Sequence, residues 1–170
     1  MVIIEDLLPK DFELVAKWLS RTEINRWLTG EWRNRVTNPS ILAIAIRNRK
    51  NRLFLVRFES KACGLVGLAD IDLADRTAMV WYLLGEDLIA RRGVTSDALR
   101  QMVRVAFGEM GMASVYAWIM EDNVASRRVL EKCGFRECGR IRQAANSNGR
   151  QVDRVYFDLT SQDFAKIPAS

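Results

Sequence analysis

Two neighbouring arginines and a glycine stand where a strand-like run gives way to a long amphipathic helix. Arg91, Arg92 and Gly93 precede this helix, which opens at Val94. The first amide groups of a helix have no internal hydrogen-bond partner and lie at the positive end of the helix dipole. With the arginine charge and a glycine that permits close backbone approach, they predict a phosphate site. A plain loop with solvated arginines is the alternative that these residues leave open.

A second stretch with chemical potential begins at Asn123, about thirty residues further along the chain. Asn123 is typical of a helix N-cap, and Gly134 is typical of the residue that ends a helix. Ser126 lies in the first turn of this helix, where a polar residue is ordinary. The stretch gains functional meaning from its pairing with the arginine and glycine loop.

The hydrophobic periodicity predicts the elements that must position these residues. Strands are expected at 2–7, 53–58, 63–73, 77–84 and 115–120, with a final hairpin of 137–144 and 154–159 around a turn at 146–149. Helices are expected at 11–19, 23–28, 38–45, 94–110 and 123–133. This order predicts an α/β (α+β) fold in which about four helices flank a mixed, mostly antiparallel sheet of six to seven strands. No linker composition divides the chain, so residues 1–170 are expected to form a single domain.

The composition narrows the classes of function. The 170 residues carry a formal net charge of +5, which favours an anionic partner without identifying it. The chain contains no histidine. This excludes serine–histidine hydrolases, papain-like proteases and most zinc enzymes.

Cysteine usage and the apolar runs bear on the environment of the protein. Cys63, Cys133 and Cys138 are few and odd in number, which favours free thiols in a reducing compartment over disulfides. Their spacing does not suit a metal site, so no metal is expected. The apolar runs are shorter than the ~20 residues that span a bilayer, and no signal peptide is evident. A soluble, cytoplasmic protein without membrane contact is expected.

The two stretches together resemble one enzyme family. The segment Arg-Arg-Gly-Val-Thr-Ser-Asp-Ala-Leu follows a strand that ends Tyr-Leu-Leu-Gly-Glu, and Asn-x-x-Ser-x-x-x-Leu-Glu-Lys-x-Gly-Phe follows about thirty residues later. This order resembles the GNAT superfamily of acyl-CoA-dependent N-acetyltransferases. The last part, from Gly139 to Leu159, resembles the branch that includes ribosomal-protein N-terminal acetyltransferases. The similarity covers nearly the whole chain.

The resemblance implies acetyl-CoA as co-substrate and assigns roles by position. The backbone at Leu83 and Leu84 would pair with the pantetheine arm and the acetyl carbonyl. The backbone amides that hold the pyrophosphate would come from Arg91, Arg92, Gly93, Val94 and Thr95. Asn123 and Ser126 would lie near the thiol end. Ser126 would be the one candidate catalytic residue, because its hydroxyl could return a proton to the departing thiolate; an ordinary polar residue of the helix turn is the alternative. The reaction would be direct attack of a primary amine on the thioester.

Four positions depart from the family pattern, namely Ala90, Thr95, Leu130 and Ala145. The usual phosphate signature, Gln/Arg-x-x-Gly-x-Gly/Ala, reads Ala-Arg-Arg-Gly-Val-Thr here, so that Thr95 crowds the loop. Leu130 stands where many members have a tyrosine general acid, and Ala145 stands where the ribosomal branch has a glutamate. The group that accepts the amine proton is therefore left open. Candidates are the carboxylates of Asp70, Asp72 and Glu86 or a water chain through Tyr82.

The resemblance implies that the helical region between the first two strands forms one wall of the acceptor cleft, so its residues predict the acceptor. This region holds Trp27, Trp32 and several arginines, and the basic bias disfavours polyamines, which would require acidic residues. A protein N-terminal amine is the first expectation, and an amino sugar or sugar nucleotide is the alternative. A non-catalytic acyl-CoA-binding regulator is a further alternative. No nucleic-acid-binding motif is recognisable, so direct nucleic-acid binding is not expected, and a homodimer is left open.

Overall fold

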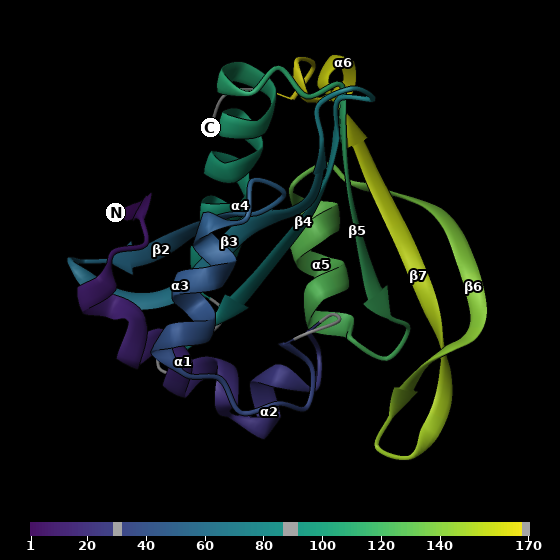
Figure 1. Cartoon of the computed structure of the whole chain (residues 1–170). Helices are drawn as coiled ribbons and strands as arrows, with labels where there is room; N and C mark the ends of the chain where they lie inside the picture. The colour runs from purple at the N-terminus through teal and green to yellow at the C-terminus, as the bar shows by residue number, and fades with distance from the viewer. Residues whose placement is uncertain (29–31, 87–91, 168–170) are drawn as a thin grey trace.

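One seven-stranded sheet organises the chain, in a computed structural model that describes residues 1–28, 32–86 and 92–167 (Figure 1). The strand order is β1-β2-β3-β4-β5-β7-β6, and only the β4–β5 pair is parallel. The strands are β1 (Val2–Asp6), β2 (Arg52–Phe58), β3 (Lys61–Asp72), β4 (Thr77–Leu84), β5 (Ser114–Met120), β6 (Arg136–Ser147) and β7 (Arg150–Thr160). The expected mostly antiparallel sheet of six to seven strands is confirmed.

Helices cover both faces of this sheet. Within the described residues the α-helices are α1 (Phe12–Ser20), α2 (Thr22–Asn25), α3 (Pro39–Arg47), α4 (Val94–Arg104), α5 (Val124–Lys132) and α6 (Ser161–Phe164). A 3-10 turn (Pro9–Asp11) precedes α1, and α4 continues into a π-helical turn (Val105–Glu109). The helix count exceeds the expected four because α2 and α6 are single turns of four residues each.

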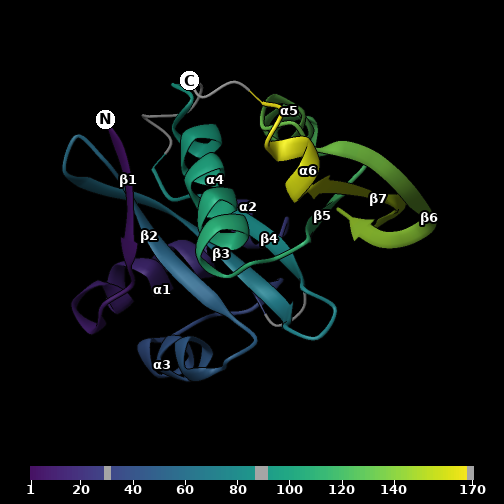
Figure 2. The same ribbon diagram turned by 90° about the horizontal axis from the view of Figure 1, so that it is seen from above.

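Alternation along β2 shows how the two layers of the core arise. Leu53 and Leu55 pack against α1 and α3, whereas Phe54 and Val56 pack against α4 on the opposite face. Successive side chains of a strand point to opposite faces, so a continuous apolar run predicts a strand covered on both sides. Figure 2 shows α4 on one face of the sheet and α1 and α3 on the other.

The final hairpin is longer than its sequence pattern predicted. Strands β6 and β7 extend to Ser147 and from Arg150, which leaves only Asn148 and Gly149 in the turn. Both turn residues have positive φ angles, 51° and 82°. This is the backbone that a two-residue type I′ turn requires, and Asn-Gly adopts it readily. The strands therefore pair right up to the turn.

Strands β4 and β5 separate part-way along their length. Their parallel ladder covers only Thr77–Met79 and Ser114–Tyr116, after which β4 continues for five residues and β5 for four. Figure 1 shows the two strands together at one end and diverging toward the other. The edge of β4 that faces β5 is thus left without a strand partner beyond Met79, and the site is built at this opening.

Candidate active site

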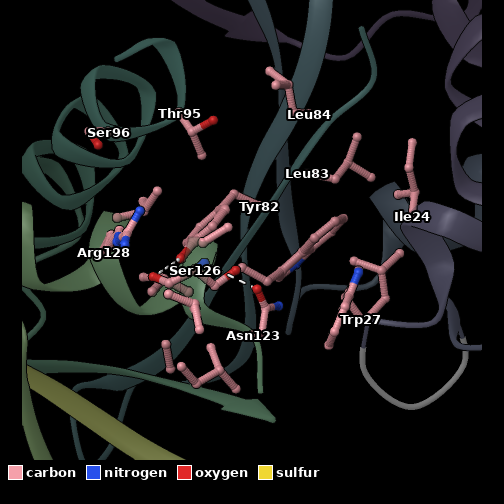
Figure 3. A pocket seen from close by; sticks show the side chains of 18 of the residues that line it. Ile24, Trp27, Tyr82, Leu83, Leu84, Thr95, Ser96, Asn123, Ser126 and Arg128 are labelled. Carbon is pink, nitrogen blue, oxygen red and sulfur yellow. Dashed lines mark hydrogen bonds between the residues drawn. The ribbon is translucent and has the colours of Figure 1, made fainter. Parts of the chain in front are cut away.

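A cavity of about 740 Å³ lies where β4 and β5 diverge. Its walls come from the end of β4, the start of α4, the first turns of α5 and the α2 region. Figure 3 shows Thr95 and Arg128 on one side, and Ile24 and Trp27 on the other. Of the site residues predicted from the sequence, the lining includes Leu83, Leu84, Gly93, Val94, Thr95, Asn123 and Ser126. The fold thus brings together two motifs that lie about thirty residues apart.

The start of α4 forms one wall of the cavity and presents free amides. Gly93 is the N-cap, with φ of 81° and no side-chain cap hydrogen bond. Its carbonyl accepts the hydrogen bond from the Asp97 amide at 3.0 Å, whereas the amides of Val94, Thr95 and Ser96 precede the first intrahelical donor. Unpartnered amides at the positive end of a helix fit a phosphate oxygen.

The positive charge beside these amides comes from α5. The Lys132 Nζ atom lies 3.8 Å from the point that a β-carbon on Gly93 would occupy, and both Lys132 and Arg128 line the cavity. The Arg92 guanidinium instead lies 4.7 Å from the centroid of the Phe58 ring and 3.8 Å from a carboxylate oxygen of Glu59. Arg91 lies outside the described residues. Sequence reasoning missed Arg128 and Lys132, although their spacing of four predicts a shared helix face.

The end of β4 is fixed by contacts from two elements. The Gly85 amide donates to the Cys63 carbonyl on β3 at 2.8 Å, and the Gly85 carbonyl accepts from Arg21 Nη1 at 2.7 Å. The Trp18 indole donates to Glu86 Oε1 at 3.1 Å. These bonds hold Leu84 at the edge of the cavity. Since no β5 residue pairs with this part of β4, its backbone can accept an extended ligand that carries amide groups.

Three residues link β4 to the first turn of α5. The Asn123 side-chain oxygen accepts the Ser126 amide hydrogen bond at 3.1 Å, as an N-cap does. The Tyr82 hydroxyl donates to the Ser126 carbonyl at 3.2 Å (Figure 3). Burial raises the pKa of Tyr82 far above its ordinary value, and a hydrogen-bonding interaction with the Ser126 side chain opposes this shift only in part. Tyr82 is therefore a neutral phenol that ties the two walls of the cavity together.

Two of the positions that depart from the family pattern, Leu130 and Ala145, are buried. Leu130, on α5, is fully excluded from solvent and belongs to the core beneath α4. Ala145, on β6, is 4% exposed and packs with Met120 and Val152, with Trp27 against this group. Neither position supplies a polar atom to the cavity.

The carboxylate at the cavity was not among the candidates from the sequence. Asp72 lies at the opposite end of β3 and accepts the amides of Ala74 and Asp75, and Glu86 accepts from Trp18. In the described part of the chain, only Glu23 brings a carboxylate to the cavity lining. It comes from α2, whose single turn carried a weak sequence signal.

Glu23 carries a negative charge at neutral pH. Its Oε1 atom accepts from Arg21 Nε at 2.7 Å. The hydrogen bond to its own backbone amide, followed by that from Arg21, lowers the pKa of Glu23 below its ordinary value. Glu23 can therefore attract a positively charged amine, and its low pKa makes it a weak proton acceptor.

Across 1–28, 32–86 and 92–167, no three or more acidic, cysteine or histidine side chains gather in a way that could hold a metal ion. No helix in these ranges has the length and apolar character needed to cross a bilayer.

Known proteins share this sequence pattern and this fold. Residues 2–136 match the family model of the acetyltransferase (GNAT) domain. The chain is 26% identical, over 96% of its length and 93% of the relative, to the Bacillus subtilis protein named "Putative ribosomal N-acetyltransferase YdaF". It is 25% identical, over 93% of its length and 92% of the relative, to an uncharacterized N-acetyltransferase, YoaA, of the same organism.

Solved structures agree with the fold. A crystal structure of a spermidine N-acetyltransferase from Vibrio cholerae in complex with CoA and spermine superposes with a TM-score of 0.87 at 18% identity, covering 97% of this chain and 98% of that one. A structure described as a probable acetyltransferase gives 0.81 at 24% identity, covering 95% and 94%. The family match spans most of the chain and includes the free amides and the diverging strands. The chain belongs to the GNAT acetyltransferase family and is an acetyl-CoA-dependent N-acetyltransferase.

Proposed function

We propose that this enzyme transfers the acetyl group of acetyl-CoA to the α-amine at the N-terminus of a protein. The observation that carries the proposal is the charge of the acceptor side. A polyamine with several cationic groups would require several carboxylates, whereas in the described lining Glu23 is the sole carboxylate and already contacts Arg21. The relative named as a ribosomal N-acetyltransferase supports the same acceptor class.

Each wall of the cavity has a part in binding acetyl-CoA under this proposal. The backbone amides of Arg91, Arg92, Gly93, Val94 and Thr95 hold the pyrophosphate. Lys132 and Arg128 add positive charge from α5. The backbone at Leu83 and Leu84 pairs with the pantetheine arm, and Asn123 lies near the thiol end. Acetyl-CoA supplies the activated acyl thioester.

An α-amine suits a site without a strong base. The pKa of an α-amine, about 7.7–8.0, leaves a large neutral fraction near pH 8. A lysine amine has a pKa of about 10.4, and its deprotonation costs about 1.36 kcal/mol for each unit by which this pKa exceeds the pH. Tyr82 keeps its proton and Glu23 has a lowered pKa, so neither is a strong base. Water can therefore accept the proton of the attacking amine. The Ser126 hydroxyl gives a proton to the departing thiolate and takes one back from water.

The proposal treats residues 1–170 as one acyltransferase domain. The same sheet contains β1 at one end of the sequence and β6 and β7 at the other, which supports this extent. The three cysteines are free, and Cys63 and Cys133 are buried. Free thiols support the cytoplasmic location that forms part of the proposal.

The test measures release of thiol from acetyl-CoA with matched acceptors. The panel contains a lysine-free peptide with a free N-terminus, the same peptide with an acetylated N-terminus and one internal lysine, spermidine, glucosamine and an amino-sugar nucleotide. We expect turnover with the first peptide and at least about tenfold lower kcat/KM for the others, a difference of about 1.4 kcal/mol. Mass spectrometry of the product locates the acetyl group.

Other outcomes would overturn the proposed acceptor. Preferential turnover of spermidine, or of an amino sugar or its nucleotide, would contradict an N-terminal substrate. Tight binding of CoA without turnover of any amine would instead indicate an acyl-CoA-binding regulator.

A further inference from the structure

A second cavity of about 570 Å³ adjoins the first on its acceptor side. It lies between the α2 region and the turn of the β6–β7 hairpin. Glu23 and Trp27 line both cavities, so the two spaces meet at these side chains. An acceptor whose amine reaches the end of β4 can therefore place its next groups in the second cavity.

Two arginines bring positive charge to this second cavity. Arg26 and Arg33 both line it, and within the described residues neither forms an ion pair with a carboxylate. The Arg26 guanidinium lies 4.4 Å from the centroid of the Trp27 ring, and its Nη1 atom is 3.5 Å from the Asn148 side-chain oxygen. The stacking fixes the position of the charge, and the long hydrogen bond leaves its donors largely free.

Arg33 is held against the hairpin. Its Nη2 atom donates to the Asn146 carbonyl and lies 4.0 Å from the Met120 sulfur. The Nε atoms of Arg26 and Arg33 are both buried, and neither has a hydrogen-bond acceptor among the residues that the structure describes. A buried donor without an acceptor is energetically unfavourable. An oxyanion that enters the cavity would supply acceptor oxygens for the two arginines.

The acidic groups nearby do not neutralise this pair. Glu23 stands at the boundary with the main cavity and is paired with Arg21. Asp122, which does not line the cavity, accepts the Ser147 hydroxyl at 2.7 Å. The remaining polar lining residues are neutral amides and hydroxyls. Among the described residues that line the cavity, two guanidinium groups face one carboxylate, Glu23, which Arg21 and Arg26 share, so these residues together carry positive charge.

The hairpin turn holds the far wall in place. The Gly149 amide donates to the Asn146 side-chain oxygen at 3.0 Å, across a two-residue turn. Trp27 packs against the small cluster of Met120, Ala145 and Val152 beneath the turn. The cavity is therefore preformed by the fold, which lowers the entropic cost of binding.

We infer that this second cavity binds a carboxylate of the acceptor, and that the enzyme prefers protein N-termini with an acidic side chain within their first few residues. The inference rests on the proposed function, because it assumes a peptide acceptor. Glu23 attracts the terminal ammonium at the boundary, while Arg26 and Arg33 bind the carboxylate beyond it. Opposite charges on the two sides orient the peptide in one direction along the joined cavities.

The test compares kcat/KM for lysine-free peptides that differ in a single side chain. Each peptide carries Glu, Gln or another uncharged residue at position 2 or at position 3. We expect the better Glu peptide to exceed its Gln counterpart by about tenfold, mainly through KM. The preference should shrink as ionic strength rises, because salt screens the charge pair.

Reversing the charge at position 26 separates a binding role from a structural one, because a purely structural residue would not change which peptide is preferred. Arg26→Glu should remove the preference for Glu and favour a peptide with Lys at the same position. Arg49→Glu, at an exposed arginine that lines neither cavity, is the matched control and should leave the preference unchanged. Thermal unfolding and CoA binding, measured for both variants, show whether each remains folded.

The outcomes separate this inference from the proposed function. Equal rates for Glu and Gln peptides would overturn the carboxylate site and leave N-terminal acetylation intact. An unchanged preference in folded Arg26→Glu would overturn it as well. No turnover of any peptide would remove both. Acetylation of glucosamine 6-phosphate but not of glucosamine, lost in Arg26→Glu, would assign the cavity to a phosphate and overturn the peptide carboxylate.

Discussion

The indole ring of Trp18 occupies the space that a side chain at position 85 would need. A β-carbon on Gly85 would lie 2.7 Å from Cγ of the indole and closer still to Cδ2 and Cε2. Real β-carbons essentially never make such contacts, so either α1 or the end of β4 would have to move. The position of Leu84 at the cavity therefore depends on the absence of a side chain at the next residue.

Gly85→Ala should disturb both stability and catalysis. Overpacking of this kind costs about 1–3 kcal/mol, and the displaced end of β4 should lower kcat/KM. Denaturant unfolding and thiol release measure the two effects. Trp18→Leu combined with Gly85→Ala should recover part of the stability, because the smaller side chain makes room. Gly108→Ala, where nothing lies within 4 Å of the added carbon, is the control and should be close to neutral.

Gly93→Glu tests the amide wall at the start of α4. The substitution places a carboxylate beside the free amides and opposite Lys132, so the Kd for CoA should rise at least about tenfold by calorimetry. Any side chain at φ of 81° is strained, so Gly93→Asn, which tolerates this backbone, controls for strain. A folded Gly93→Glu variant with the CoA affinity of the wild type would contradict a phosphate site here.

Asn123 has a capping role that can be separated from contact with the co-substrate. Asn123→Ala should remove the hydrogen bond to the Ser126 amide and cost about 1 kcal/mol, whereas Asn123→Ser should retain a cap. If the side-chain amide also contacts acetyl-CoA, Asn123→Ser should keep its unfolding midpoint but raise the KM for acetyl-CoA. Wild-type kinetics in Asn123→Ser would restrict the residue to capping.

Ser126→Ala should lower kcat several-fold with little change in the KM for either substrate. The expected cause is loss of the hydroxyl that returns a proton to the thiolate. Because the Ser126 backbone makes the hydrogen bonds to Asn123 and Tyr82, the substitution leaves both in place. A kcat equal to that of the wild type would assign Ser126 to the helix turn alone.

The three thiols should differ in reactivity and link stability to pH. Burial raises the pKa of Cys63 and of Cys133 to about 11, whereas Cys138 is exposed. At pH 8 about one buried thiol in a thousand is ionised, so a disulfide reagent should titrate one thiol per folded chain and none in Cys138→Ser. Titration of three thiols in the folded protein would contradict this burial.

The same two groups set the direction of the pH effect. Since folding raises their pKa values above about 9, the folded state binds more protons than the unfolded state between pH 9 and 11. Their contribution to stability is complete below pH 9 and is lost as the pH rises to about 11. The urea midpoint should fall across this range, and by less in Cys63→Ala or Cys133→Ala when each is compared with its own value at pH 8.

The sequence was most informative where local chemistry decides the structure. The apolar runs at 53–58 and 63–73 predicted two strands, and the Asn-Gly pair at 148–149 predicted the last turn. The start of the helix at Val94, directly after Gly93, was also predicted from the sequence. The helix expected at 94–110 instead changes to a π-helical turn after Arg104, where the Met110 amide donates to the Val105 carbonyl.

The charged side chains of the site were harder to predict, because their positions depend on which face of a helix or loop is turned toward the cavity. Arg92 was expected beside the phosphates by virtue of its place in the loop, yet its guanidinium contacts Phe58 and Glu59. Lys132 stands next to Gly93 in space and 39 positions away in sequence. Glu23 reaches the cavity from a helix of one turn. No local pattern specifies these three orientations.

The short ladder between β4 and β5 has a thermodynamic consequence. Only three residue pairs join the two strands, so the free protein gives up backbone pairing that a regular sheet would make. A ligand that hydrogen-bonds to this edge in the folded state alone must raise the free energy of unfolding, by about 2.7 kcal/mol at a hundred times its Kd. Thermal melting with and without CoA thus measures how far the small molecule takes the place of a missing β-strand.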